Sequence, residues 1–139
     1  MYYSLSKWGG GATCGIGVSV SDKPEGPFTD QGKLFRSNEI DVHNSIDPFY
    51  IEDNGKKYLF WGSWYGIWGI ELTEDGLGLK GGIENAKATK IQVAANTGGT
   101  NAYEGSYILK RGKYYYLFCS TGTCCDGANS TYQTVVCRS

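Results

Sequence analysis

The stretch Asn44-Ser45-Ile46-Asp47-Pro48-Phe49-Tyr50-Ile51 decides the fold, because a similar stretch recurs later in the chain. In the first copy, an aspartate stands at the start of an apolar run that has the composition of a β-strand. Proline biases the residue before it toward extended backbone, so we expect Asp47 to be extended at the mouth of a strand. In the second copy, residues 102–109, Glu104 stands at the start of a comparable apolar run.

The same succession of elements follows each of these stretches. A short basic turn with a glycine comes next, at residues 53–57 and again at 110–113, and an aromatic strand follows each turn. The chain therefore contains a repeat of about 57 residues, with one carboxylate in each copy. Short strands joined by hairpin turns at a fixed period are typical of propeller blades. We therefore predict an all-β fold, and we expect no amphipathic helix.

The expected strands group into three units. In chain order they cover residues 1–5, 14–21, 28–35, 46–52, 58–63, 66–72, 89–93, 105–110, 113–120 and 131–138. Residues 1–40 form an incomplete blade, 41–98 a complete blade and 99–139 another incomplete blade. The first unit starts at what would be its second strand, and the last ends after its third, so we expect about two and a half blades. Open sheet edges invite pairing with another chain, which favours a homodimer.

Composition excludes several classes of partner. The formal net charge is −1 and no basic block is present, so we expect neither nucleic-acid binding nor binding to a membrane surface. No apolar run approaches the ~20 residues of a spanning helix, and no signal peptide is visible after Met1. The 11 tyrosines and 4 tryptophans have amphipathic rings that suit a sugar-binding cleft. The 5 cysteines are an odd number without metal-site spacing, so we expect at least one thiol that is free or pairs between chains, and no zinc site.

Five motifs in order carry a resemblance to a known family. They are residues 44–48, residues 61–64 (Trp-Gly-Ser-Trp), Glu104 with Tyr107-Ile108, residues 114–118, and residues 124–132 with their Cys124-Cys125 pair. Together they resemble the glycoside hydrolases of family 43, and within that family the arabinan-cleaving branch. The resemblance implies a five-bladed β-propeller of four-stranded antiparallel sheets. It also implies inverting hydrolysis of α-1,5-linked L-arabinan or arabino-oligosaccharides, and an extracellular or periplasmic location.

The resemblance also implies roles for the two carboxylates. Glu104 corresponds to the general acid, and Asp47 to the residue that orients the acid and tunes its pKa. The family's general-base aspartate has no counterpart, because the chain starts after the position where it would lie. Members often carry a central metal ion, but the histidine that helps to hold it is absent here, so we expect no cofactor in this chain.

Five residues near these carboxylates are candidates for substrate binding. Asn44 and Ser63 could donate hydrogen bonds to sugar hydroxyls, and Trp64 and Tyr65 could stack on a furanose ring, with Ile46 beside them. Each also has an ordinary alternative, as a turn amide or as a half-buried aromatic side chain.

A few other residues are weaker candidates. His43, the only histidine, is more typical of a packing residue than of a ligand. Asp41, Asp53 and Asp126 could be considered as a substitute base, but the pattern does not favour any of them. Cys124-Cys125 is expected in a loop that borders the cleft, where packing is favoured over redox chemistry.

Three interpretations of function stay open at this point. The first is an arabinan hydrolase that assembles from two copies, with the base supplied by the partner chain or by another aspartate. The second is a carbohydrate-binding remnant that lacks the general-base aspartate. The third is a fragment of a longer protein. Endo and exo action are not distinguished.

Overall fold

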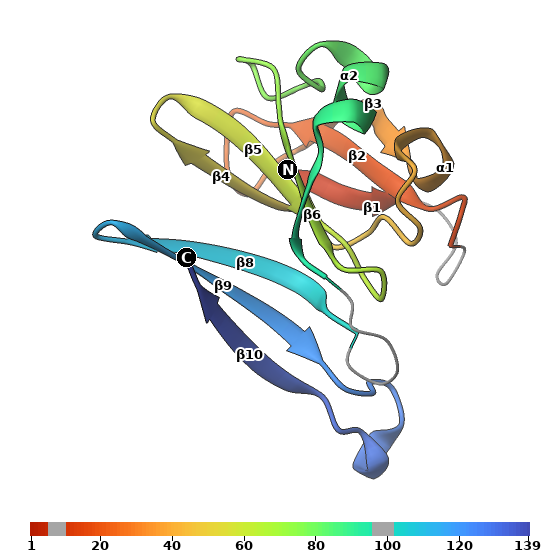
Figure 1. Cartoon of the computed structure of the whole chain (residues 1–139). Helices are drawn as coiled ribbons and strands as arrows, with labels where there is room; N and C mark the ends of the chain where they lie inside the picture. The colour runs from red at the N-terminus through yellow and green to blue at the C-terminus, as the bar shows by residue number, and fades with distance from the viewer. Residues whose placement is uncertain (6–10, 96–101) are drawn as a thin grey trace.

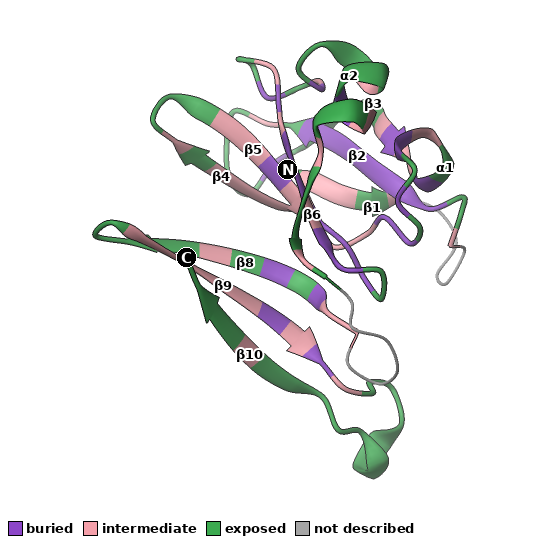
Figure 2. Ribbon diagram, viewed as in Figure 1, coloured by how far each residue is buried: buried purple, intermediate pink, exposed green. Residues whose placement is uncertain are grey.

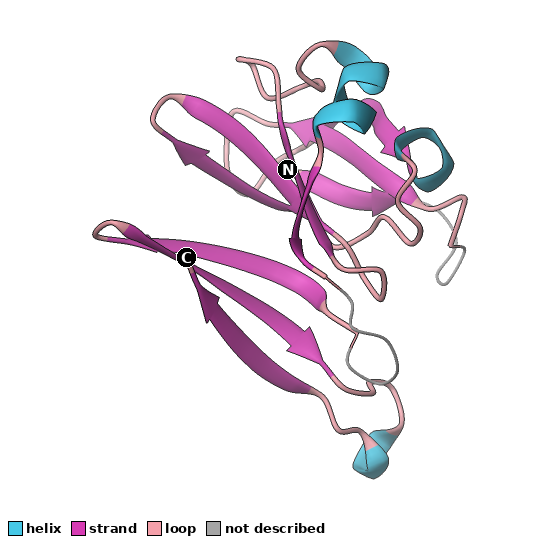
Figure 3. Cartoon of the chain, in the orientation of Figure 1, coloured by secondary structure: helices cyan, strands magenta, loops and turns pink. Residues whose placement is uncertain are grey.

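The computed structural model describes residues 1–5, 11–95 and 102–139, which form three antiparallel β-sheets (Figures 1 and 3). The first sheet has the order β1 (Tyr2–Leu5), β2 (Gly15–Val20), β3 (Thr29–Arg36). The second has the order β4 (Phe49–Asp53), β5 (Lys56–Trp61), β6 (Ile67–Glu71), β7 (Ile91–Ala94). The third has the order β10 (Gln133–Arg138), β9 (Tyr114–Thr121), β8 (Glu104–Arg111). The all-β class is confirmed.

Each expected strand overlaps an observed strand, with boundaries that agree to within a few residues. The three sheets have three, four and three strands, in the order in which the sequence units were expected. The expected boundary between residues 98 and 99 lies outside the described residues.

Two short helices that no apolar periodicity predicted interrupt the strands. Helix α2 (Gly82–Thr89) joins β6 to β7, and α1 (Ser37–Ile40) is a single turn after β3. Because α2 buries only Ala86, with Ile83 half-buried beside it, its sequence lacks the apolar stripe by which periodicity reveals a helix. A 3-10 turn, η1 (Gly127–Asn129), precedes β10. No helix in the described part of the chain is long and apolar enough to cross a membrane.

The main hydrophobic core lies between the first and second sheets. It consists of Ile16, Phe35, Ile40, Val42, Leu59, Trp61, Ile70, Leu72, Leu79 and Ala86. Trp61 has no exposed surface and packs against the ring of Phe35, with 5.1 Å between the ring centroids. Figure 2 shows buried residues concentrated in β2 and β6, whereas β10 is largely exposed. The first two sheets therefore supply most of the buried apolar surface.

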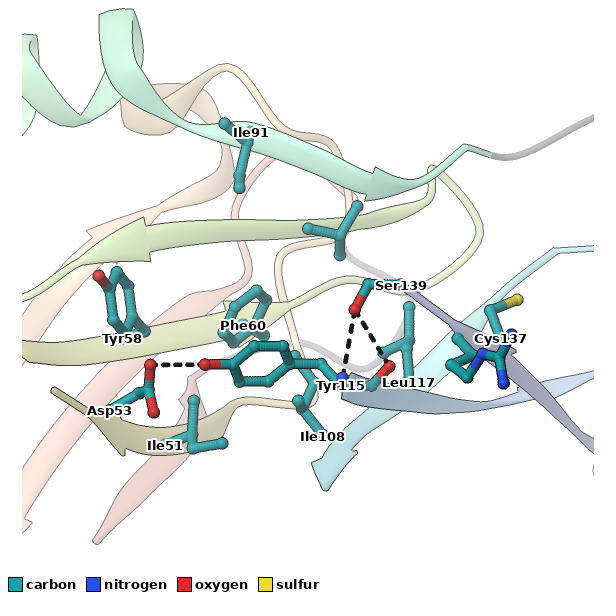
Figure 4. Close-up of a pocket in the computed structure, with 12 residues that line it drawn as sticks. Ile51, Asp53, Tyr58, Phe60, Ile91, Ile108, Tyr115, Leu117, Cys137 and Ser139 are labelled. Atoms are coloured by element: carbon teal, nitrogen blue, oxygen red, sulfur yellow. Dashed lines mark hydrogen bonds between the residues drawn. The ribbon is translucent and has the colours of Figure 1, made fainter. Parts of the chain in front are cut away.

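Aromatic rings and an ion pair join the third sheet to the second. The rings of Phe49 and Tyr107 meet edge to face, 5.0 Å apart. At the hairpin ends of the sheets, Asp53 accepts a hydrogen bond from the Tyr115 hydroxyl at 2.6 Å (Figure 4). It also accepts one from the Lys110 ammonium. These two donors hold the pKa of Asp53 below its ordinary value.

A largely apolar cavity of about 460 Å³ lies beside Asp53, between the second and third sheets (Figure 4). Its walls include Ile51, Phe60, Ile108 and Leu117. Of the site residues considered from the sequence, only the weaker candidate Asp53 lines this cavity, which belongs to the contact between the sheets.

The sequence repeat is visible in two hairpins. β4 and β5 are joined by the two-residue turn Asn54-Gly55, and both turn residues have positive φ, at 51° and 75°. This conformation is that of the hairpin turns whose twist matches the flanking strands. β8 and β9 are joined by Gly112-Lys113 in the corresponding place, with Gly112 at a φ of 60°.

The second copy of the repeat differs from the first by a β-bulge in its first strand. The pairing of β8 with β9 is interrupted between Glu104 and Tyr107, and Gly105 within the bulge has a φ of 57°. A glycine in the left-handed region is the usual first residue of one bulge type. Glu104 is the first residue of β8, whereas Asp47 precedes β4, so the two carboxylates are related but not strictly equivalent.

Candidate active site

Asp47 and Glu104 come together where the three sheets meet. Glu104 begins β8 and forms an isolated antiparallel bridge with Ser63, which follows β5. The backbone N–H of Asp47 donates to the hydroxyl oxygen of Ser4 on β1, at 3.1 Å. The backbone N–H of Gly105 donates to the Asp47 carboxylate. Contacts from the first and third sheets therefore hold Asp47 beside Gly105, the residue that follows Glu104 in the bulge.

The backbone of Asp47 is not extended, contrary to the expectation from Pro48. Its φ is 58°, in the left-handed region. Aspartate tolerates this region better than most residues, and such conformations persist where surrounding contacts fix them. Here the bonds from Ser4 and Gly105 do so. Tertiary contacts, rather than the local preference before proline, set the direction of this carboxylate.

Buried hydrogen bonds hold the segment before Asp47. The backbone N–H of Asn44 donates to the Gly11 carbonyl at 2.7 Å, and the Asn44 side-chain amide donates to the Ser63 carbonyl at 3.3 Å. The Ser45 hydroxyl accepts the indole N–H of Trp61 at 2.9 Å. Asn44 and Ser63 are only 2 % and 3 % exposed. The structure thus places both among the supports of the site, and their contact with a sugar stays a prediction.

The environment of Asp47 favours its protonated form. Burial is the larger cause and the nearby charge of Glu104 the smaller one, and together they raise the pKa of Asp47 above its ordinary value. The hydrogen bond from Gly105 acts in the opposite direction without cancelling the rise. A carboxyl group with a raised pKa beside a second carboxyl group is typical of acid–base sites.

Replacing Asp47 with asparagine is expected to stabilise the protein at neutral pH. Because the folded-state pKa is raised, the folded protein binds a proton that the unfolded chain releases, from pH 3.8 up to the raised value. Stability therefore falls as pH rises through that window. The melting temperature of Asp47→Asn should exceed that of the wild type at pH 7, and the difference should vanish below pH 3.8. A matched control is Asp22→Asn, at an exposed turn residue. A difference in melting temperature between wild type and Asp47→Asn that is zero, or that does not change with pH, would contradict this account.

Glu104 is held by Tyr132, a residue for which no role was predicted from the sequence. Glu104 is 8 % exposed, and the hydroxyl of Tyr132 donates to its Oε2. Burial and this hydrogen bond raise the pKa of Tyr132, so its hydroxyl keeps its proton and stays a donor. The only signal in the sequence was the place of Tyr132 at the end of the motif over residues 124–132. Tyr132 therefore fixes the orientation of the Glu104 carboxyl group.

Replacing Tyr132 with phenylalanine is expected to lower the rate of the hydrolysis that we propose for this site by about 10- to 100-fold. This range corresponds to the ~1.5–3 kcal/mol of a hydrogen bond to a charged group. Since the ring is kept, the fold and the affinity for substrate should change little. The measurement is kcat and KM on arabino-oligosaccharides, together with the melting temperature. A change in KM alone would show that Tyr132 binds substrate and does not position Glu104.

An exposed aromatic turn follows β5. Gly62 has a φ of 138°, and a Cβ there would come within 2.0 Å of the Gly66 carbonyl, so a glycine is required. Between them Trp64 and Tyr65 are each 48 % exposed, and Trp64 has a φ of 68°. The backbone N–H of Trp64 donates to the Tyr103 carbonyl at 3.3 Å, which ties the turn to the residue before Glu104. Ile46 is half-buried nearby, and stacking of a furanose on these two rings stays a prediction.

His43, Asp41 and Asp53 have structural partners. The His43 ring packs edge-on against Tyr65, with 4.8 Å between centroids. Asp41 pairs with Lys87 at 3.0 Å. Asp53 is bound at the opposite, hairpin end of the sheets.

The described residues do not fit a metal ion. Across residues 1–5, 11–95 and 102–139, no group of three or more His, Cys, Asp and Glu side chains converges on one point. His43 faces Tyr65. No step of the chemistry below uses a metal.

Carboxylate pairs beside exposed aromatic rings are the chemistry of glycoside hydrolases. Comparison with known proteins leads to the same class. The family model described as "Glycosyl hydrolases family 43" matches residues 1–139. The chain belongs to glycosyl hydrolase family 43.

Several proteins similar to this chain are named as arabinan-cleaving enzymes. Arabinan endo-1,5-alpha-L-arabinosidase A of Aspergillus aculeatus is 34 % identical over 99 % of this chain and 43 % of its own length. An exo-1,5-alpha-L-arabinanase from a bovine ruminal metagenomic library is 36 % identical, with a TM-score of 0.76, over 100 % of this chain and 48 % of its own. The Cellvibrio cellulosa alpha-L-arabinanase complexed with arabinohexaose is 29 % identical, with a TM-score of 0.75, over 99 % and 47 %. The chain thus spans about half the length of these relatives.

Proposed function

We propose that this chain carries the acid half of an arabinanase active site, for inverting hydrolysis of α-1,5-linked L-arabinan or arabino-oligosaccharides. One observation carries the proposal: Glu104, buried and held by Tyr132, lies beside Asp47 through the hydrogen bond from Gly105. The family membership and the arabinan-cleaving relatives support the substrate class.

In the proposed chemistry, Glu104 is the general acid. Its proton passes to the glycosidic oxygen as the bond to the leaving sugar breaks. Asp47 orients this acid from the position in which the hydrogen bond from Gly105 holds it. The hydroxyl of Tyr132 keeps the acid aimed at one position.

Inversion also requires a base that activates water on the opposite face of the sugar, about 6.5–9.5 Å from the acid. We assign this base to no residue of the chain, since Asp41 and Asp53 are bound elsewhere. We propose that a group outside this copy of the chain supplies it in the assembled active site. In the binding-remnant alternative no group supplies the base, and the chain binds arabino-oligosaccharides without cleaving them.

The three sheets are proposed to be consecutive blades of a five-bladed β-propeller. The units expected at 1–40, 41–98 and 99–139 then contain the first, second and third sheets. Blades place the first residues of their inner strands around a common axis, and the bridge between Ser63 and Glu104 supports this arrangement. Pairing of two copies through sheet edges stays a prediction, as does an extracellular or periplasmic location.

Substrate binding is proposed to use the turn that carries Trp64 and Tyr65. Their exposed rings offer apolar faces on which a furanose could stack. Ile46 would contact the same sugar, whereas Asn44 and Ser63 would act on it only after a rearrangement of the bonds they now make.

The proposed function is tested by binding and hydrolysis together. Calorimetry with arabinohexaose should detect binding to the wild type, and Trp64→Ala should weaken it. A conservative control is Val136→Ala, an exposed apolar residue on β10. Release of reducing sugar by a preparation of known oligomeric state identifies the hydrolase, whereas binding without release identifies the remnant. Absence of binding to arabinohexaose would refute the substrate assignment.

A further inference from the structure

Cys124 and Cys125 form a pair of facing thiols in the connection between β9 and β10. Their Sγ atoms are 2.7 Å apart, and both side chains are exposed. Cys14 and Cys119, in contrast, are buried. A reagent in solution can therefore reach the adjacent pair before it reaches either buried thiol.

The loop that carries the pair is fixed from both sides. The backbone N–H of Thr123 donates to the Thr131 hydroxyl oxygen at 3.0 Å, and the backbone N–H of Thr131 donates to the Thr123 carbonyl at 3.0 Å. Beyond the pair, the backbone N–H of Asp126 donates to the Ser130 hydroxyl at 3.1 Å. Cys125 has a φ of 66°, a conformation that a non-glycine residue keeps only where its surroundings hold it. The facing of the two thiols is thus built into the loop.

This loop borders the proposed acid. The connection that carries the cysteines also carries Tyr132, whose hydroxyl binds Glu104. The contact with Cys125, together with burial and the charge of Glu104, raises the pKa of Cys124, so Cys124 and Glu104 lie within electrostatic reach of each other. A change in the charge or shape of the pair therefore changes the electrostatic surroundings of Glu104 and the position of Tyr132.

We propose that Cys124 and Cys125 are a redox modification site, which a disulfide oxidant such as glutathione disulfide closes into a vicinal disulfide at the rim of the sugar-binding cleft. One cysteine thiolate attacks glutathione disulfide and releases the first glutathione thiolate. The second cysteine then attacks the mixed disulfide and releases the second. The pair loses two electrons and two protons, and glutathione disulfide is reduced to two glutathione molecules. Closure shortens the distance between the two Sγ atoms from 2.7 Å to a bond of about 2.05 Å.

Closure changes what the rim offers to a sugar. Two polar, ionisable thiols are replaced by a rigid and apolar ring next to the acid. This second part rests on the proposed function, since it assumes that a sugar binds beside Glu104. It predicts that the oxidised and reduced proteins differ in their affinity for arabino-oligosaccharides.

The modification is tested by mass spectrometry without any sugar. The wild-type protein is equilibrated in buffers of reduced and oxidised glutathione, alkylated and cleaved by chymotrypsin after Phe118 and Tyr132. We expect residues 119–132 to lose two hydrogens at the 124–125 pair while Cys119 stays open to alkylation after unfolding. Cys137→Ser, at an exposed thiol outside the loop, should behave as the wild type, and Cys124→Ser should not close. A stable glutathione adduct, or a disulfide from the pair to Cys119, Cys137 or another chain, would overturn the proposal.

The effect on the cleft is tested by calorimetry with arabinohexaose on the same oxidised and reduced samples. We expect Kd to differ by about threefold or more between the two forms of the wild type, and not at all between the same treatments of Cys124→Ser. Equal affinities in a protein shown to be closed would overturn the role at the rim. Absence of binding in both forms would refute the proposed function, while the mass measurement still decides whether the pair closes.

Discussion

Replacement of Glu104 with glutamine is expected to slow hydrolysis of debranched arabinan by about 10²–10⁴-fold, the usual contribution of general acid catalysis. Glutamine has nearly the same shape and can still accept the Tyr132 hydroxyl, but it has no proton to give to the leaving oxygen. The fold and the affinity for arabinohexaose should therefore be retained. The measurement is the rate of release of reducing ends by wild type and variant at the same oligomeric state.

The nature of the leaving group separates loss of an acid from general damage. In an aryl arabino-oligosaccharide whose leaving group is a strongly acidic phenol, the phenolate departs without being protonated. Glu104→Gln should therefore cleave this substrate at a rate close to that of the wild type. An equal loss on arabinan and on the aryl substrate would mean that Glu104 is not the acid. Glu52→Gln is a suitable control, because Glu52 is an exposed residue on β4.

Replacement of Trp61 with alanine is expected to lower the free energy of unfolding by about 3–5 kcal/mol. Trp61 is fully buried between the first and second sheets, where its ring packs against Phe35. Its indole N–H also binds Ser45, so the substitution loses a buried hydrogen bond as well as a large apolar volume. Since this bond holds the segment that leads to Asp47, the candidate site should be disturbed together with the core.

Urea denaturation measures this effect, with Trp64→Ala as the matched control. Trp64 is a tryptophan three residues further along the chain, but it is 48 % exposed, so its loss should change the free energy of unfolding by less than about 0.5 kcal/mol. Comparable effects of the two substitutions would contradict the assignment of the core.

Much of the fold was predictable because strands and their turns leave patterns in short stretches of sequence. The alternation of apolar residues, the Asn54-Gly55 turn and the glycine of the second hairpin are signals within a few residues of each other. Helix α2 gave no such signal, because it buries little more than Ala86. The bulge at Gly105 also escaped prediction, since a glycine in a strand marks several possible irregularities.

The site was predictable in its residues more than in its geometry. The repeat and the family resemblance singled out Asp47 and Glu104, but the left-handed backbone of Asp47 depends on contacts with Ser4 and Gly105 from other sheets. The role of Tyr132 likewise depends on a contact between residues far apart in the chain. Such contacts leave no local pattern, so only a three-dimensional structure brings these residues together.

The central claim is that Asp47 and Glu104 form one coupled acid unit, and titration of Asp47 tests it most directly. Carbon NMR of protein labelled at the aspartate carboxyl groups would follow this titration in wild type and in Glu104→Gln. We predict that the pKa of Asp47 is above the ordinary 3.8 in the wild type and falls in the variant, while staying above 3.8 because burial remains. An Asp47 that titrates at its ordinary value in both proteins would contradict the account, since the two carboxyl groups would then not share a site.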